Sequence, residues 1–345
     1  MRNPIRLLLC ALISVAGCDA SSIDPGAADM RRVRDLAEPA DPDPDDAGTP
    51  AGPPDLLPDK AGPPYPIVLV HGMAGFRNIG PIEYFYGVPE ALRKDGHDVW
   101  VSRQDPINDS EVRGRQTLDY VQMVLLATGK AKVNLIGHSQ GGFDVRYVAS
   151  TIGARVASVT MVASPMEGAP IADLAINGTG PAAKDALSFL LNIYGAVGGF
   201  NSNAKAQLTN LTSAGAKAFF AKHPDDNRVA YYSITGRSDN TGPDVADCIA
   251  PAKPPFIAKW DQYRDPMDVL FQIPTGIMNG MNPRPVHDGL VTVLSARHGV
   301  FLGCIPADHM DEVGQLVGDS PGGGNRFDHV QFYRDLAAWI KSKGF

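Results

Sequence analysis

The chain has 345 residues, a formal net charge of −7 and 44% hydrophobic residues. This length suffices for one large domain with a substantial core or for two modest ones. The mild acidity and the lack of a basic patch disfavour a nucleic-acid partner.

The N-terminal segment has the layout of an export signal. Two arginines precede an apolar run over residues 7–15, which is too short to span a bilayer as a helix. The run ends in Val15-Ala16-Gly17-Cys18, which resembles the cleavage site of bacterial lipoproteins. We therefore expect residues 1–17 to be a signal peptide. Acyl chains on Cys18 would then anchor the exported protein to a bacterial membrane, on its periplasmic or cell-surface face. An ordinary secretory signal with an incidental cysteine is the alternative.

Residues 18–62 differ in composition from the rest of the chain. They are dominated by Ala, Asp, Pro and Gly. Such a segment buries too little apolar surface to offset its ordering entropy, so we predict a disordered tether. A folded domain is expected over residues 63–345.

The chain contains four cysteines. Cys10 leaves with the signal peptide and Cys18 is expected to carry lipid. Cys248 and Cys304 then remain as one pair in an oxidising compartment, where a disulfide is the natural hypothesis. Two buried free thiols are the alternative.

From residue 63 onward, short apolar segments alternate with helical ones. Apolar, β-branched runs predict strands at residues 66–70, 98–101, 133–136, 156–162, 229–234 and 297–302. Helices fit between the first of these, at residues 82–95, 112–128 and 140–152. This alternation predicts an α/β fold with a mostly parallel central sheet flanked by helices. Ligands of such sheets bind beyond the carboxyl ends of the strands.

The pentapeptide Gly137-His138-Ser139-Gln140-Gly141 follows a predicted buried strand and opens a predicted helix. This is the strand–turn–helix context that the G-x-S-x-G nucleophile elbow requires. The turn strains the backbone of the serine and needs small neighbours, which Gly137, Gly141 and Gly142 provide. We therefore interpret Ser139 as a nucleophile.

A serine nucleophile needs a base and an orienting acid. In folds with this elbow, the acid and then the histidine follow the serine along the chain. Of the downstream histidines, His309 lies in a loop just after a predicted strand, whereas His298 falls inside that strand and His329 opens the last helix. Asp288, next to His287 in another strand-edge loop, fits the acid. On order and context alone, this pairing remains one of several.

The oxyanion hole of this fold usually combines two backbone N–H groups. One belongs to the residue after the nucleophile, here Gln140, and the other to the loop after an early strand. His71-Gly72-Met73-Ala74-Gly75 is that loop, so Met73 is the expected second donor. A simple strand-to-loop turn is the alternative interpretation of this segment.

Several segments, in the same order, resemble the secreted triacylglycerol lipases of the Pseudomonas and Burkholderia type, which have the α/β-hydrolase fold. The resemblance runs from about Tyr65 to Leu316 and supports Asp288 as the acid and His309 as the base. It is carried by residues 65–72, 83–88, 133–142, 287–291 and 308–313.

The resemblance implies a serine hydrolase that cleaves triacylglycerols or other acyl esters through an acyl-enzyme, without an organic cofactor. An esterase or polyester depolymerase with the same triad is the first alternative. A catalytically inactive surface-binding lipoprotein is the second.

The same resemblance implies a structural calcium ion, bound by two aspartates and two backbone carbonyls. By position these are Asp265 and Asp311, with the carbonyls of Gln315 and Asp319. Asp268 competes with Asp265 for its role.

Further features follow from the resemblance. Members of the family cover their site with an amphipathic lid, which corresponds to about residues 176–226 here; an apolar helical stretch at residues 183–200 contains glycines suited to a hinge. An ordinary core helix is the alternative. Leu294 stands where many members have a cysteine, so the disulfide is expected elsewhere. Some members need a dedicated folding chaperone, and a monomer is expected.

Overall fold

The computed structural model describes residues 61–345 except 77, 80–81, 197–201 and 316–320. The predicted signal peptide, Cys18 and nearly all of the predicted tether therefore lie outside the described residues. None of the described helices is long and apolar enough to cross a membrane.

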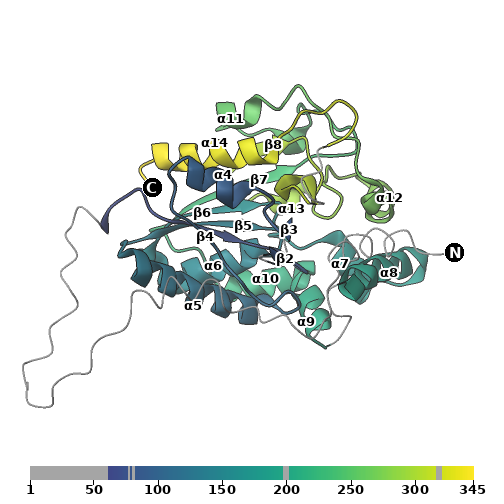
Figure 1. The fold of residues 1–345 in the computed structure, drawn as a ribbon. Coiled ribbons are helices and arrows are strands. Elements are labelled where there is room, and N and C mark those ends of the chain that lie inside the picture. The colour runs from purple at the N-terminus through teal and green to yellow at the C-terminus, as the bar shows by residue number, and fades with distance from the viewer. Residues whose placement is uncertain (1–60, 77, 80–81, 197–201, 316–320) are drawn as a thin grey trace, which may run out of the picture.

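A sheet of six parallel strands forms the centre of the domain (Figure 1), in the order β4-β1-β5-β6-β7-β8. Every residue of β1, β5 and β6 is buried, as expected for β-branched strands that are covered on both faces. This confirms the predicted α/β class. The strands are β1 (Ile67–Val70), β4 (Val99–Val101), β5 (Val133–His138), β6 (Val156–Val162), β7 (Ala230–Gly236) and β8 (Val300–Ile305), and a small antiparallel pair is formed by β2 (Asn78–Ile79) and β3 (Ile82–Glu83).

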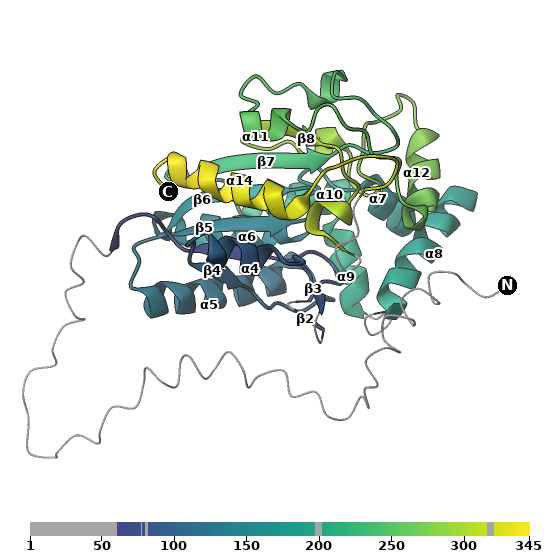
Figure 2. The ribbon, with the colours of Figure 1, turned by 45° about the horizontal axis from the view of Figure 1, so that its top comes forward.

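Helices cover both faces of the sheet (Figures 1 and 2). Because side chains alternate along a strand, β1 contributes Ile67 and Leu69 to one apolar cluster and Val68 and Val70 to another. The first cluster is completed by α4 (Val88–Lys94) and α14 (His329–Ser342), and the second by α5 (Ser110–Thr128) and α6 (Gly141–Ile152).

Two predicted boundaries are wrong, and a left-handed glycine accompanies each. The helix expected over residues 82–95 begins only at Val88, after Gly87 at φ 68°, and residues 82–83 form β3 instead. The strand expected over residues 297–302 begins at Val300, after Gly299 at φ 58°. His298 therefore precedes the strand instead of lying in it.

Four helices between β6 and β7 form a cap beside the sheet: α7 (Pro170–Asn177), α8 (Gly180–Ala196), α9 (Ser202–Asn210) and α10 (Ser213–Lys222). They include the described part of the predicted lid region. An apolar cluster joins them to α6 through Phe143 and to Phe271 before α12 (Gln272–Asn279). Phe189 and Tyr194 place the inner face of α8 in this cluster, fully buried.

A long excursion connects β7 to β8 and returns past the carboxyl ends of the strands. It contains η2 (Ala246–Cys248), α11 (Pro255–Ala258), η3 (Val269–Phe271), α12 and α13 (Val293–Ala296); η1 (Gly153–Arg155) precedes β6, and η4 (Asp311–Val313) follows β8.

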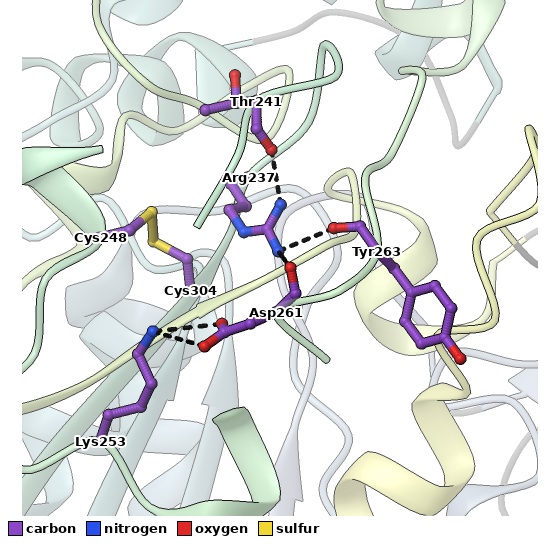
Figure 3. The surroundings of a disulfide bond; sticks show 7 residues. All are labelled: Arg237, Thr241, Cys248, Lys253, Asp261, Tyr263 and Cys304. Carbon is purple, nitrogen blue, oxygen red and sulfur yellow. Dashed lines mark hydrogen bonds and ion pairs between the residues drawn. A yellow bond between two sulfur atoms is a disulfide. The ribbon is translucent and has the colours of Figure 1, made fainter. Parts of the chain in front are cut away.

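The predicted disulfide is confirmed, because Cys248 and Cys304 are joined by an S–S bond of 2.01 Å (Figure 3). It connects η2 to β8 and excludes the alternative of two free thiols. Nearby, the buried Arg237 donates to the carbonyls of Thr241 at 2.6 Å and Tyr263 at 3.0 Å. The excursion is thus held to the sheet by one covalent bond and by a guanidinium that binds backbone.

Candidate active site

Ser139 occupies the tight turn between β5 and α6. Its φ of 55° lies in the left-handed region, which is strained for a serine. A Cβ at Gly137 would lie 2.4 Å from the Gly141 carbonyl oxygen, and one at Gly141 would lie 2.3 Å from that of Val70. The turn therefore needs bare backbone at both positions. The Ser139 N–H donates to the Val162 carbonyl at 2.9 Å, which holds the turn against β6.

Asp288 and His309 come together at the carboxyl-terminal edge of the sheet. Nδ1–H of His309 donates to Asp288 Oδ2 at 2.8 Å, and the carboxylate is completely buried. Its other oxygen accepts the N–H groups of Leu290 and Val291 at 2.8 and 2.7 Å. These bonds hold the carboxylate in one orientation towards the imidazole.

The His309 ring lies beside the elbow, because its centroid is 4.7 Å from that of His138, the residue before Ser139. Two of the other downstream histidines are engaged elsewhere. His298 pairs with Asp225 at 2.7 Å, ahead of β7 and therefore at the opposite edge of the sheet, and His329 donates to the Tyr86 carbonyl. Of these histidines, His309 alone combines a buried carboxylate with a place at the elbow.

Glu312 is a buried acid in this site to which sequence reasoning assigned no role. Its Oε2 lies 2.9 Å from His138 Nε2 and 3.9 Å from His309 Nδ1. His138 also shares a 2.7 Å hydrogen bond with the Tyr84 hydroxyl. Burial, with the nearby Asp288 charge, raises the pKa of Glu312 well above its usual value, and burial lowers that of His138. Burial therefore favours the neutral form of each group. In the sequence, the only indication that Glu312 lies near His309 is that it follows this histidine by three residues.

The loop after β1 lies directly against the nucleophile. A Cβ at Gly72 would lie 2.6 Å from the Ser139 Cβ. Among the described residues, neither the Met73 nor the Gln140 backbone N–H has a hydrogen-bond partner. Two donors without a partner in the described part of the chain thus flank the serine, on the two residues expected to form an oxyanion hole.

A buried ion pair supports this loop. Arg113 Nη2 on α5 lies 2.8 Å from Asp144 Oδ2 on α6, and both side chains are fully buried. The same guanidinium donates to the His71 carbonyl at 2.7 Å, and Gln104 donates to that carbonyl at 3.0 Å. The start of the loop is therefore fastened to the two helices that pack under the elbow.

Three buried aspartates cluster beside the histidine loop. The carboxylate oxygens of Asp265, Asp308 and Asp311 lie within 4.8 Å of one another. Burial, with the charges of the neighbouring acids, raises their pKa values to about 6, 8 and 10 respectively. Asp311 Oδ2 is buried and has no hydrogen-bond partner among the described residues. A hard cation suits this cluster, since it would satisfy that oxygen and neutralise the charges.

The cluster differs in membership from the expected calcium ligands. Asp265, rather than its competitor Asp268, contributes a carboxylate, and Asp308 was not foreseen although it directly precedes His309. Both Asp308 oxygens already accept backbone N–H groups, from Met310, Asp311 and Asp268. The Gln315 side chain donates to the Glu83 and Tyr84 carbonyls. Asp319 lies outside the described residues.

Comparison with known proteins is consistent with this geometry. Residues 65–264 match a family model described as the alpha/beta hydrolase fold. A triacylglycerol lipase of Vibrio cholerae is 32% identical over 306 residues, which cover 81% of this chain and 88% of that one. One from Burkholderia plantarii is 31% identical and is covered to 87%, again with 81% of this chain. The mature lipase BlEst2 of Bacillus licheniformis shares the fold, with a TM-score of 0.52 at 22% identity over 77% of this chain and 92% of that one.

Proposed function

The chain belongs to the α/β-hydrolase family, among its bacterial triacylglycerol lipases, and is a lipase or esterase; from this premise we propose that it cleaves acyl esters with Ser139, His309 and Asp288 as its catalytic triad. The observation that carries the proposal is the buried Asp288–His309 pair, whose imidazole lies beside the strained elbow. An inactive binding protein would need neither the strain at Ser139 nor two free N–H groups beside it.

Each residue of the proposed site has one role in the reaction. Ser139 Oγ attacks the ester carbonyl while His309 Nε2 takes its proton and then returns it to the leaving alcohol. Asp288 orients the imidazole and stabilises its charged form. The N–H groups of Met73 and Gln140 bind the tetrahedral oxyanion. Water, activated by the same histidine, releases the acid from the acyl-enzyme.

We propose acylglycerols as the substrate class. The apolar cluster beneath the cap joins α8 to the Met73 loop, so the surroundings of the site suit an acyl chain. Leu191 on α8, Val269 on η3 and Ile273 on α12 remain exposed, and α8 packs against α12. These side chains support contact of this face of the cap with a lipid surface. An esterase or polyester depolymerase with the same triad is the competing proposal.

A rate comparison separates these substrates. We expect the purified protein to hydrolyse emulsified long-chain triacylglycerol and long-chain p-nitrophenyl esters, with a rise in rate when an oil–water interface forms. Released fatty acid is measured by titration at constant pH. Activity confined to dissolved short-chain esters, without a rise at the interface, would support the esterase instead.

We propose a structural calcium ion at Asp265 and Asp311, with Asp308 beside them and the backbone carbonyls of Gln315 and Asp319 completing its shell. The buried, unpartnered oxygen of Asp311 and the hard-donor chemistry of the cluster support this. The ion would neutralise the carboxylates next to His309 and so hold the histidine loop, without taking part in the reaction.

We also propose that Cys18 anchors the enzyme to a bacterial membrane after export. The support is the signal-like sequence before it and the tether-like composition after it. When the full-length protein is expressed in a bacterium, the mature form should sediment with the membranes. Mass spectrometry should detect acyl chains on its first residue. The variant Cys18→Ser should be released in soluble form. If the wild-type protein is itself soluble and unacylated, the ordinary secretory signal is the correct interpretation.

A further inference from the structure

A buried polar chain runs from the cap to the oxyanion residues. The Tyr194 hydroxyl on α8 lies 2.8 Å from Gln207 Oε1 on α9 and 3.2 Å from the Met73 sulfur. Gln207 Nε2 donates to Gln140 Oε1 at 2.6 Å. A cap residue therefore donates to the Gln140 side chain, and another contacts the Met73 side chain.

A second contact links the cap to the oxyanion loop through backbone. Gln207 Nε2 also donates to the Pro106 carbonyl at 3.1 Å, and the same carbonyl accepts the Ala74 N–H at 2.9 Å. Ala74 follows Met73 and has a φ of 55°, an uncommon conformation for alanine. Gln207 therefore binds the acceptor that keeps this strained turn in place.

The side-chain amides of Gln140 and Gln207 donate and accept their hydrogen bonds in one consistent direction along this series of contacts. Gln140 Nε2 donates to the Asn108 carbonyl and to Ser110 Oγ, which leaves its Oε1 to accept from Gln207. Gln207 Oε1 in turn accepts from the Tyr194 hydroxyl. Tyr194, Gln207 and Gln140 are all completely buried. Removal of one link would leave a buried polar group unsatisfied, and such networks resist distortion for that reason.

We propose that Tyr194 and Gln207 are positioning residues, which aim the Met73 and Gln140 N–H groups at the oxyanion. The cap thereby determines the geometry of the oxyanion hole as well as covering the site. This inference rests on the oxyanion role proposed above. Both side chains are completely buried and contact Met73 and Gln140, so we assign each an action through the residue that it holds.

The variants Tyr194→Phe and Gln207→Leu test the inference. Tyr194→Phe keeps the buried ring and removes only the hydroxyl. Because complete loss of an oxyanion donor lowers kcat about 10²–10³-fold, a displaced donor should lower it about 10-fold, with KM changed less than about twofold. The affinity for a trifluoromethyl ketone with an acyl-like chain should fall by the same factor as kcat/KM, since its serine adduct carries the tetrahedral oxyanion.

Tyr231→Phe is the matched control. Tyr231 is a buried tyrosine of β7 whose hydroxyl accepts the Asp226 N–H at 3.0 Å, close to the amino-terminal edge of the sheet. This variant should lose stability, measured as Tm, without a change in kcat or in ketone affinity. A purely structural role of Tyr194 and Gln207 would give the same pattern for all three variants, and that result would overturn the inference. Absence of ester hydrolysis by the wild-type protein would instead refute the proposed function.

Discussion

Replacement of Ser139 by alanine is expected to lower kcat for ester hydrolysis by at least about 10⁴-fold, because the variant has no nucleophile and only binding and oxyanion donors remain. The fold should be retained, since the turn is held against β6 by the Ser139 backbone N–H, which the variant keeps. Initial rates on p-nitrophenyl esters measure the loss. Labelling of the wild-type protein with an organophosphate, followed by peptide mapping, should place the adduct on Ser139.

Ser139→Gly provides the control for folding. The serine φ of 55° is strained for any residue with a Cβ, whereas glycine adopts it freely. We therefore expect Ser139→Gly to be as inactive as Ser139→Ala and more stable than it, by about 1 kcal/mol, in urea unfolding. Wild-type rates in either variant would contradict the assignment of the nucleophile.

Removal of calcium by EDTA is expected to lower the free energy of unfolding by about 3–5 kcal/mol, the range seen when a buried charge loses its partner. The carboxyls of Asp265, Asp308 and Asp311 would then lie buried together without the cation, so each must carry an uncompensated charge or bind a proton. Thermal unfolding with EDTA and with added calcium measures the difference. An unchanged Tm in EDTA would refute the calcium proposal and leave the triad unaffected.

The effect of EDTA should depend on pH in a defined direction. The pKa values of the three carboxyls in the folded, ion-free protein are raised to about 6, 8 and 10, above the unfolded value of about 3.9. Between the unfolded and the folded pKa value of each carboxyl, the folded state holds a proton that the unfolded state has released. The ion-free protein therefore loses stability as pH rises from about 4 to about 10, whereas calcium takes the place of the protons. The difference in Tm with and without calcium should accordingly grow with pH.

Asp311→Asn separates the ion from general charge effects. It removes the charge next to the unpartnered oxygen, so the variant should lose the stabilisation by calcium while its ion-free form unfolds no more easily than the wild-type protein. Asp119→Asn, at an exposed position on α5, is the matched control and should keep the full response to calcium. Equal responses in both variants would place the ion elsewhere.

The sequence alone was sufficient where a feature depends on neighbouring residues. The elbow at Ser139 could be recognised because its glycines, strand and helix are contiguous. The disulfide between Cys248 and Cys304 followed from the number of cysteines and the expected compartment, and the structure confirms it. The predicted starts of α4 and β8 were wrong, because a single left-handed glycine, Gly87 or Gly299, interrupts an apolar pattern that continues on both sides of it.

Only the tertiary structure decided which distant polar groups share a buried site. Glu312 reaches His138, and Asp265 reaches Asp308 and Asp311, because the return of the chain to the carboxyl edge of the sheet brings these loops together. Tyr194 lies in a stretch whose pattern indicates only an apolar helix, and its packing against Met73, like that of Gln207 against Gln140, depends on the tertiary structure. The local sequence determined the strained turn and its nucleophile, because backbone strain and glycine spacing are short-range. The burial and pairing of the surrounding acids and amides depend on long-range packing, which no local pattern contains.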